Sequence, residues 1–431
     1  MHISKAKLAA VLVSAAMILS GCGAAEIPAT ENTAPVQTTA EEAVPAAVES
    51  VSTTSVTKVP ELDLDALATP TEPEEQLSPA ELKLRDMTLE EKVGQLFVIR
   101  PEQLAGSISE EGIGNSGDEG LTLVSDDMAE FAAQYHIGGY ALFARNIETP
   151  KQLKRFTADL KAISDLPPML LIDEEGGDIT RIAGSEKFPD VPVFGNMHDI
   201  GETGDAEKAR EAGAAIGGYL AEYGFTGDLA PVADINSNPD NIVIGDRAFG
   251  DDPETVSAMV SAFIDGLDSA GVSSCLKHFP GHGDTSDDTH DGYVAVTKTW
   301  KELRQQELIP FIENMDKADM IMTAHITMEK VSSDGLPASL SKEIVTDRLR
   351  GELGYDGIVI TDALAMSAVT DQYGSGQAAV LAFQAGNDIL LMPESIKPAY
   401  GAVLEAVKNG EISVERLDES VLRILRYKLE R

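Results

Sequence analysis

The sequence predicts an α/β fold, a (β/α)8 barrel of the TIM type, and two observations point to it. From about residue 81 onward, short apolar runs alternate with amphipathic, helix-like segments. This alternation is typical of a parallel sheet that helices cover on its outer face. Polar residues also gather where the apolar runs end. The strand ends of a barrel converge on one mouth, so this clustering favours the barrel over a doubly wound open sheet.

Eight apolar runs are the expected strands. In chain order they are VGQLFVI (93–99), GGYALFA (138–144), PMLLID (168–173), GDLAPVADI (227–235), VSSCLKHF (272–279), DMIMTAH (319–325), GIVITDAL (357–364) and NDILLMP (387–393). Helices are expected between them, for example PKQLKRFTADLKAIS (150–164), DPETVSAMVSAFIDGLDSAG (252–271) and SKEIVTDRLRGEL (341–353). The second of these helices opens on an Asp-Pro start signal and ends on a glycine.

The amino terminus has the features of an export signal. Two lysines precede an uncharged apolar run, LAAVLVSAAMILS (8–20), which is too short to span about 30 Å of hydrocarbon. The run leads into LSGC (19–22), which resembles the lipobox of bacterial lipoproteins. That resemblance implies a signal peptide over residues 1–21 and lipid attached to Cys22. Acyl chains would then anchor an extracytoplasmic protein to the cell membrane. An ordinary secretory signal with an incidental cysteine is the alternative.

Residues 22–80 are expected to form a disordered tether. The stretch after Cys22 has no aromatic residues and no helical periodicity, and it carries eleven acidic side chains against Lys58 alone. Such a self-repelling segment does not bury enough apolar surface to fold. The expected organisation is therefore a signal peptide (1–21), a lipidated cysteine with an acidic linker (22–80) and one globular domain (81–431).

The whole chain is strongly acidic, with 33 basic and 72 acidic residues and a formal net charge of −39. This charge repels nucleic-acid phosphates and anionic lipid head groups, so both are poor partners. Contact with a membrane is expected through the lipid anchor only. The sequence carries no signal for an assembly, and a monomer is the default expectation.

Cys275 has no possible disulfide partner once Cys22 is lipidated, because the chain has only two cysteines. It lies in the apolar run GVSSCLKHF (271–279). A small buried apolar side chain is therefore expected, and a catalytic thiol is the alternative.

The segment KHFPGHGDTSDDTH (277–290) holds three of the seven histidines. His278 and His282 have the i, i+4 spacing of a helical zinc pair. The proline and glycines among them disfavour a helix, so a strand end followed by a glycine-rich loop is expected. A metal site on this loop is the weaker alternative.

Asp288 and His290 lie two residues apart in the same segment. In an extended loop both side chains therefore point to one side. A carboxylate beside an imidazole fixes its tautomer and gives a proton donor and acceptor that works near neutral pH. A hydrogen bond that only stabilises the loop is the alternative.

Two further acidic positions follow predicted strands. Asp362 ends the apolar run in GIVITDALAMS (357–367), where an ionised carboxylate could act as a nucleophile or stabilise a cation. A helix N-cap is the alternative. In IDEEGG (172–177) three acids end the strand, and two glycines let the backbone turn closely around a bound molecule. A carboxylate nucleophile with a separate acid/base, here His290, suggests glycoside cleavage through a covalent glycosyl-enzyme.

These motifs together resemble glycoside hydrolase family 3. KHFPGHGDTSDDTH, IDEEGG, IGDRAFGDDPE, MTAH and GIVITDALAMS are similar in particular to its β-N-acetylglucosaminidase branch, which acts on cell-wall fragments. The similarity extends from about LRDMTLEEKVGQLFV (84–98) to ESVLRILRYKLER (419–431) and so covers the whole globular part.

The resemblance implies a role for each matching residue. Asp362 would be the nucleophile, and His290 would be the acid/base with Asp288 as its partner. His282 would have a structural role in the loop, and no metal or other cofactor is implied. The terminal sugar would be bound by Asp173, Arg247, Lys277, His278 and, near them, His325.

Several features depart from the family pattern. Thr289 replaces the usual serine between the aspartate and histidine, which leaves both functional groups in place. Asp178 stands where many relatives have arginine, although Arg181 follows it, so contacts beyond the first sugar are in doubt. Some relatives carry a second α/β domain, and a single-domain form is expected here. The polar stretch 101–128 is either a lid over the mouth or a surface loop.

Three functions are compatible with these features. The first is an exo-acting, retaining β-N-acetylglucosaminidase that acts on peptidoglycan fragments or chitin-type oligosaccharides. The second is a phosphorylase, because a neutral imidazole repels phosphate less than a carboxylate acid/base does; the acidic chain argues mildly against it. The third is a lipid-anchored sugar-binding protein. The presence of Asp362, His290 and Asp288 argues against it, because binding alone needs neither a nucleophile nor a proton donor.

Overall fold

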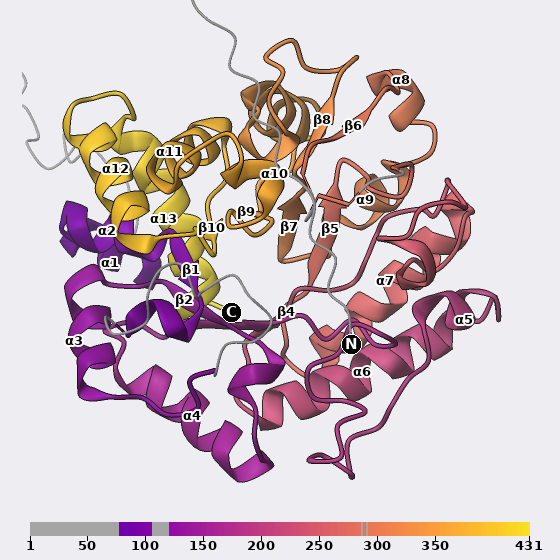
Figure 1. Ribbon diagram of the computed structural model, residues 1–431, viewed down its shortest axis with the longest axis horizontal. Helices are drawn as coiled ribbons and strands as arrows, with labels where there is room; N and C mark the ends of the chain where they lie inside the picture. The colour runs from indigo at the N-terminus through magenta and orange to yellow at the C-terminus, as the bar shows by residue number, and fades with distance from the viewer. Residues whose placement is uncertain (1–76, 106–119, 286–287, 290–291) are drawn as a thin grey trace, which may run out of the picture. The chain divides into compact units, whose positions relative to one another are not determined.

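The computed structural model describes residues 77–105, 120–285, 288–289 and 292–431 (Figure 1). The chain divides into two units, Met1–Pro73 and Glu74–Arg431, and all described residues belong to the second. The signal peptide, Cys22, most of the tether, His290 and the middle of the stretch 101–128 lie outside the described residues.

All eight predicted strands are present in the described part of the chain. They are β1 (Phe97–Ile99), β2 (Gly139–Leu142), β3 (Met169–Ile172), β4 (Gly227–Asp228), β5 (Cys275–Phe279), β7 (Met320–Thr323), β9 (Ile358–Thr361) and β10 (Leu390–Leu391). They are shorter than the apolar runs that predicted them, because several runs continue into buried loop residues at the strand ends.

These eight strands close into a barrel. Parallel pairing gives one sheet in the order β10-β1-β2-β3-β4 and a second in the order β5-β7-β9. Parallel bridges join the two sheets at both edges, between Gly227 and Ser273 and between Ile360 and Ile389. The predicted (β/α)8 barrel is confirmed, and the open sheet is wrong.

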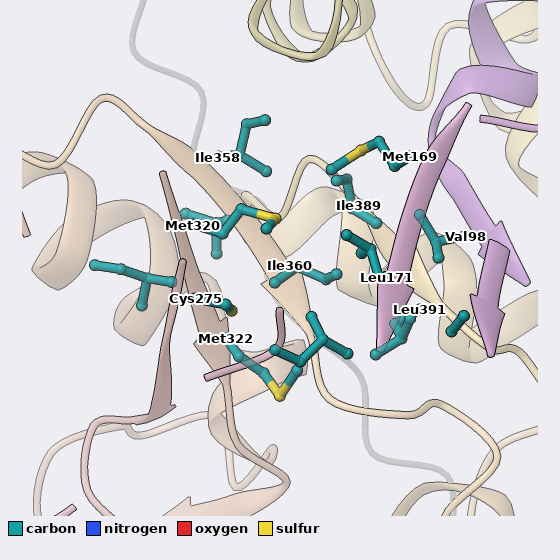
Figure 2. Packing of buried hydrophobic residues seen from close by; sticks show 14 of the residues in the cluster. Val98, Met169, Leu171, Cys275, Met320, Met322, Ile358, Ile360, Ile389 and Leu391 are labelled. Carbon is teal, nitrogen blue, oxygen red and sulfur yellow. The ribbon is translucent and has the colours of Figure 1, made fainter. Parts of the chain in front are cut away.

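The barrel interior is filled by apolar side chains. Figure 2 shows Val98, Leu171, Met322, Ile360 and Leu391, from five different strands, packed together, and all are at most 2% exposed. Cys275 of β5 belongs to this cluster and is fully buried, and burial raises the pKa of its thiol far above the ordinary value. The prediction of a small buried apolar side chain is therefore confirmed.

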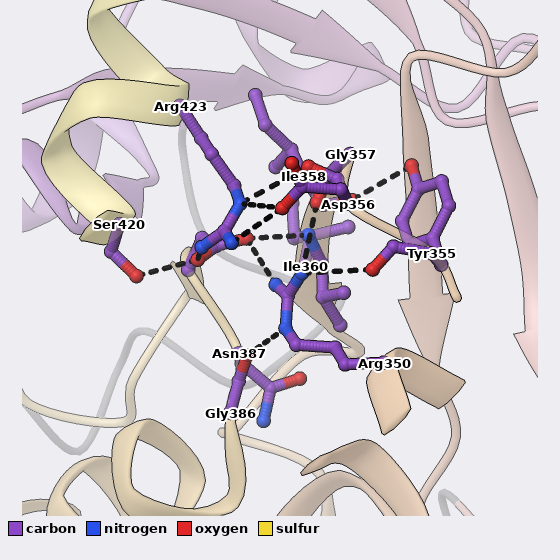
Figure 3. Close-up of polar contacts among 12 residues, drawn as sticks. Arg350, Tyr355, Asp356, Gly357, Ile358, Ile360, Gly386, Asn387, Ser420 and Arg423 are labelled. Atoms are coloured by element: carbon purple, nitrogen blue, oxygen red, sulfur yellow. Dashed lines mark hydrogen bonds and ion pairs between the residues drawn. The ribbon is translucent and has the colours of Figure 1, made fainter. Parts of the chain in front are cut away.

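A buried ion cluster reinforces the seam between β9 and β10. Asp388, which is fully buried, accepts hydrogen bonds from Arg350 Nη2 (2.5 Å) and from the backbone N of Val359 (2.9 Å). Ser420 donates to the other carboxylate oxygen at 2.5 Å, and Arg423 Nη1 lies 3.4 Å from it. Figure 3 shows these arginines converging from two elements on the start of β9. The cluster joins η7, β9, the start of β10 and the carboxyl-terminal helix.

Helices surround the barrel (Figure 1). Their bounds are α1 (Pro79–Asp86), α2 (Leu89–Gln95), α3 (Asp126–Tyr135), α4 (Pro150–Ala162), α5 (Met197–Gly201), α6 (Ala206–Glu222), α7 (Pro253–Ser269), α8 (Trp300–Leu303), α9 (Ile309–Asn314), η7 (Glu343–Glu352), α10 (Ser367–Thr370), α11 (Ser375–Ala385), α12 (Ile396–Lys408) and α13 (Val414–Leu429). In the described part of the chain, no helix is both long enough and apolar enough to cross a membrane.

The start signal of α7 works as the sequence predicts. Asp252 caps the helix by accepting from the backbone N of Thr255 at 2.9 Å, and Pro253 fills the first helical position. Along its length α7 packs closely on α6. A Cβ atom at Gly266 would lie 2.3 Å from the backbone O of Arg210, so only glycine allows this approach.

Two features of the fold differ from the sequence expectations. The predicted helix 341–353 is present as η7, whose backbone makes the wider turns of a π-helix; apolar periodicity does not separate the two helix types. A parallel two-stranded ribbon, β6 (Val294–Val296) with β8 (Ile326–Met328), lies in the loops after β5 and β7. Neither strand was predicted from the sequence, although each has three residues, as β1 does.

Candidate active site

Polar side chains from several strands and their following loops meet at the carboxyl end of the barrel. Asp173 directly follows β3, Lys277 and His278 lie within β5, and Asp362 directly follows β9. Asp234 and Arg247 come from the loop after β4, and His325 lies just beyond β7. This is the face on which barrel proteins place their ligand sites.

Lys277 is the centre of a charged cluster. Its Nζ lies 2.8 Å from Asp173 Oδ1 and 2.6 Å from Glu175 Oε1, and its side chain is 2% exposed. Arg247 forms two parallel hydrogen bonds with Glu175, Nε to Oε2 and Nη2 to Oε1, each of 2.8 Å. The structure thus brings together three of the predicted sugar-binding residues: Asp173, Arg247 and Lys277.

The charges of this cluster are mutually dependent. Burial opposes ionisation of Lys277, but Asp173 and Glu175 raise its pKa above the ordinary value. Burial likewise opposes ionisation of Glu175, but Lys277 and Arg247 hold its pKa far below the ordinary value. Lys277, Glu175 and Arg247 are therefore charged at neutral pH. Because two of them are nearly fully buried, the cluster is rigid and polar at the floor of the mouth.

Glu174 anchors the loop that carries Asp173 and Glu175. Its buried carboxylate accepts from the backbone N atoms of Ile182 (3.1 Å) and Ala183 (2.8 Å) and from Tyr219 Oη (2.9 Å). Its own backbone N donates to Asp228 Oδ1 at 2.9 Å. The loop is therefore held on both sides of its glycine turn.

Arg181, three residues after Asp178, reaches the same site. Its Nη2 lies 3.7 Å from Asp173 Oδ2, and its guanidinium lies 5.5 Å from the centre of the Phe143 ring. Asp178 itself is exposed. Arg181 therefore supplies a positive charge beside Asp173.

Asp234 orders the histidine segment. Its fully buried carboxylate contacts His278 Nδ1 at 2.7 Å and accepts from the backbone N atoms of His278 (3.0 Å) and His282 (2.6 Å). The ring of His282 lies 2.8 Å, through Nδ1, from Thr285 Oγ1. The two histidines therefore lie at a strand end and in the loop after it, as the sequence predicts, and not on a helix. Their structural partners are oxygen atoms of the protein.

Asp362 is partly exposed at the mouth. Its backbone N donates to the backbone O of Thr323 at 2.9 Å, and Oδ1 accepts from the backbone N of Ala363 at 2.7 Å. The next helix, α10, has Met366 at its N-cap, so the N-cap alternative for Asp362 is wrong. Burial opposes its ionisation, but His325, His278 and Lys277 together with the Ala363 N–H hold its pKa below the ordinary value.

His325 supports the segment after Asp362. Its Nε2 lies 2.9 Å from the backbone O of Ala363, and its Nδ1 lies 2.6 Å from Ser339 Oγ. Because a carbonyl only accepts, Nε2 carries a proton. His325 is 1% exposed, so it lies behind Asp362 and not at the surface of the mouth.

The loop after β5 approaches α10. The backbone N of Ala368 donates to the backbone O of Thr289 at 3.2 Å. This contact brings the Asp288–Thr289 pair close to the segment that follows Asp362. His290 lies outside the described residues.

No group of three or more histidine, cysteine or acidic side chains with metal-binding geometry occurs in the ranges that the structure describes. Two residues with clear contacts in the site, Glu175 and Asp234, had no role assigned from the sequence. Both lie near a predicted strand end, but nothing local distinguishes them from other acidic loop residues. Their importance comes from partners 44 to 102 residues away in the chain.

The fold and the charged mouth define a (β/α)8-barrel protein of the kind that binds its substrate at the strand ends. Residues 88–427 match the Glycosyl hydrolase family 3 N terminal domain. The chain therefore belongs to glycosyl hydrolase family 3.

Named relatives agree with this membership. The chain is 37% identical over 345 residues to a β-hexosaminidase A of Pseudoalteromonas piscicida, covering 73% of this chain and 57% of that protein. It is 33% identical over 316 residues to the β-hexosaminidase LpqI of Mycobacterium tuberculosis, covering 70% and 78% of the two chains. This chain thus spans less than two thirds of the first relative but most of the second.

Solved structures show the same fold. A family 3 β-N-acetylglucosaminidase from Paenibacillus sp. str. FPU-7 superposes with a TM-score of 0.71 and 39% identity, covering 79% of this chain and 62% of that one. The structure of M. tuberculosis LpqI superposes with a TM-score of 0.68 and 29% identity, covering 82% and 96%.

Proposed function

We propose that this chain is an exo-acting, retaining β-N-acetylglucosaminidase that removes terminal N-acetylglucosamine from peptidoglycan fragments or chitin-type oligosaccharides. The observation that carries the proposal is the position of Asp362. It is an ionised carboxylate at the barrel mouth, beside His278 and His325 and close to the Lys277 cluster. The relatives named β-hexosaminidase support this choice of sugar.

The Lys277 cluster would hold the terminal sugar. Asp173, Arg247 and Lys277 present charged hydrogen-bonding groups in fixed positions, because each is paired with another member of the cluster. Charge-assisted hydrogen bonds to sugar hydroxyls are stronger and more directional than neutral ones. His278 would contact the same sugar, and His325 would support Asp362 from behind.

The reaction would proceed in two displacements. In the first, an Asp362 carboxylate oxygen bonds to the anomeric carbon while the bond from that carbon to the leaving oxygen breaks, and His290 gives its proton to that oxygen. In the second, the neutral His290 takes a proton from water, and the water oxygen displaces Asp362. Two inversions give net retention. Asp288 would orient His290 and stabilise its charged form.

Product analysis tests this proposal directly. The full-length protein is incubated with an aryl β-N-acetylglucosaminide and with the matching β-glucoside, each with and without phosphate. Free N-acetylglucosamine that forms at a rate independent of phosphate is the expected result. Sugar 1-phosphate would instead identify a phosphorylase. Sugar binding without turnover of either substrate would identify a binding protein.

Replacing His290 by alanine is expected to slow turnover by about 10²- to 10⁴-fold on substrates with poor leaving groups, the range that general acid catalysis contributes. For substrates whose leaving group needs no proton, the rate of the first displacement should stay close to that of the wild type. The measurement is a comparison of kcat/KM for an aryl glycoside with an acidic phenol and for a disaccharide. An equal loss of kcat/KM on both substrates would show that His290 has a structural role and is not the proton donor.

We also propose that lipid on Cys22 anchors the chain outside the cytoplasm, on the basis of the LSGC sequence (19–22). A Cys22→Ser variant is expected to leave the membrane fraction, or to remain as an unprocessed precursor, because no acyl chain is attached. Fractionation of cells that produce each form, with detection of the chain, measures this. A variant that is processed to the size of the mature wild type and still fractionates with the membrane would show that lipid at Cys22 is not the anchor.

A further inference from the structure

Ile242 is the most exposed large apolar side chain in the ranges that the structure describes, with a relative exposure of 84%. It lies in the loop between β4 and α7, and the same loop supplies Arg247 to the charged cluster at the mouth. Single exposed apolar side chains are common on protein surfaces. What distinguishes Ile242 is the part of the fold that presents it.

The backbone around Ile242 is held in one conformation. Asn241, which is 5% exposed, accepts through Oδ1 from the backbone N atoms of Val243 (2.9 Å) and Ile244 (2.8 Å). Ile244 is buried, and the backbone O of Val243 accepts from Arg247 Nη1 at 2.9 Å. A ligand that contacts the side chain of Ile242 therefore does not have to order the loop, which lowers the cost of binding.

The same loop is attached to the histidine segment (277–290) that begins in β5. Asn241 Nδ2 donates to the backbone O of His282 at 2.9 Å. Asn238 Nδ2 donates to the backbone O of Thr285 at 3.1 Å. The loop that presents Ile242 therefore borders both the histidine segment and the charged cluster.

The proposed reaction brings the leaving group to the same part of the mouth. An exo-acting enzyme encloses the terminal sugar, so the rest of the substrate has to leave the pocket across its rim. His290, the proposed proton donor, belongs to the histidine segment, and a proton donor has to lie within hydrogen-bond reach of the leaving oxygen. The leaving group is therefore expected next to the loop that presents Ile242.

We propose that Ile242 is a specificity-determining residue that packs against a ring face of the leaving sugar, so that the enzyme favours a sugar as leaving group. The inference rests on the proposed function and deepens it, because it names what is recognised beyond the terminal sugar. A pyranose with equatorial substituents, as in N-acetylglucosamine, presents only C–H groups on each ring face. Burial of these groups against an aliphatic side chain is favourable and needs no hydrogen-bond partner.

The first experiment compares a large and a small leaving group. We measure kcat/KM for di-N-acetylchitobiose, which releases a sugar, and for N-acetylglucosaminyl fluoride, which releases a single atom. Ile242→Ser should lose about 3- to 12-fold on the disaccharide, which corresponds to about half of the free energy of burying an isoleucine side chain. On the fluoride the variant should keep the wild-type value, because fluoride does not extend to the rim.

Two further variants control this comparison. Ile242→Val keeps most of the aliphatic surface and should stay close to the wild type on both substrates. Leu82→Ser is the matched control, because Leu82 is also an exposed apolar side chain (42%) but lies on α1, which packs on α13. It should change the rate on neither substrate.

The second experiment needs no turnover. The full-length protein, labelled with ¹³C at its isoleucine methyl groups, is titrated with S-linked di-N-acetylchitobiose, whose sulfur bridge resists hydrolysis, and separately with N-acetylglucosamine. The methyl signal of Ile242 is assigned by its absence from the spectrum of Ile242→Val. We expect this signal to shift with the disaccharide and not with the monosaccharide, because a single sugar fills only the pocket inside the rim.

The outcomes separate this inference from the proposed function. Equal losses of kcat/KM on the disaccharide and the fluoride in Ile242→Ser, or no loss on either, would overturn the inference and leave the glycosidase intact. A methyl signal that stays in place while the disaccharide binds would overturn it as well. A wild type that turns over neither substrate would overturn the proposed function, and the titration would still decide whether Ile242 contacts the second sugar.

Discussion

Replacing Asp362 by asparagine is expected to reduce kcat by about 10⁴- to 10⁶-fold, the range seen when a nucleophile is removed. The amide cannot form the covalent bond to the anomeric carbon, and it no longer carries the charge that stabilises an oxocarbenium-like transition state. The loss should be the same for all leaving groups, since both steps need this carboxylate. The measurement is kcat and kcat/KM on an aryl β-N-acetylglucosaminide.

The same variant should fold normally. The side-chain oxygen of the introduced asparagine can still accept from the backbone N of Ala363, the contact that Asp362 makes now. Sugar binding, measured by calorimetry with N-acetylglucosamine, should survive because the Lys277 cluster is untouched. Turnover within about tenfold of the wild type, by a protein free of contaminating enzyme, would contradict the role proposed for Asp362.

Replacing Asp388 by alanine should produce the largest loss of stability, about 3–5 kcal/mol in the free energy of unfolding. The change leaves Arg350, Arg416 and Arg423 around a buried site without their shared carboxylate. It also leaves the backbone N of Val359 without its side-chain acceptor. The seam between β9 and β10 depends on this cluster, because the two strands are joined by an isolated bridge and not by a continuous ladder. Urea unfolding followed by circular dichroism measures the effect.

Asp356→Ala is the matched control for this prediction. Asp356 also pairs with Arg423, but its side chain is 84% exposed, and exposed ion pairs contribute about 0–1 kcal/mol. The control should therefore unfold at nearly the wild-type urea concentration. Equal effects of the two replacements would show that the buried cluster does not stabilise the seam.

The barrel was predictable because its strands are buried on both faces. Eight apolar runs and the acids or histidines at their ends are a strong pattern, and Asp362, Lys277 and His278 lie where this pattern places them. The pairing of β4 with β5 was predictable only from the fold class. It consists of isolated bridges, and no sequence pattern marks the residues that form them.

Glu175, Asp234 and Asp388 show what the sequence did not reveal. Each is an acidic residue near a strand, and each becomes central only through partners brought near by folding. Local composition does not distinguish a buried, multiply paired carboxylate from an exposed one such as Asp178 or Asp356. The paired groups offset the free-energy cost of burying the charge. They come together only when the barrel closes.

In the proposed reaction Asp362 forms a covalent bond with the sugar. The most direct measurement uses an N-acetylglucosaminyl fluoride that carries a second fluorine on the ring, which slows hydrolysis of the glycosyl-enzyme. The protein is then digested and the labelled peptide is sequenced by mass spectrometry. We expect one sugar per chain, on Asp362 within GIVITDALAMS (357–367). A label on another residue would contradict the covalent role of Asp362. Reversible inhibition by the compound without any label on the protein would contradict it as well.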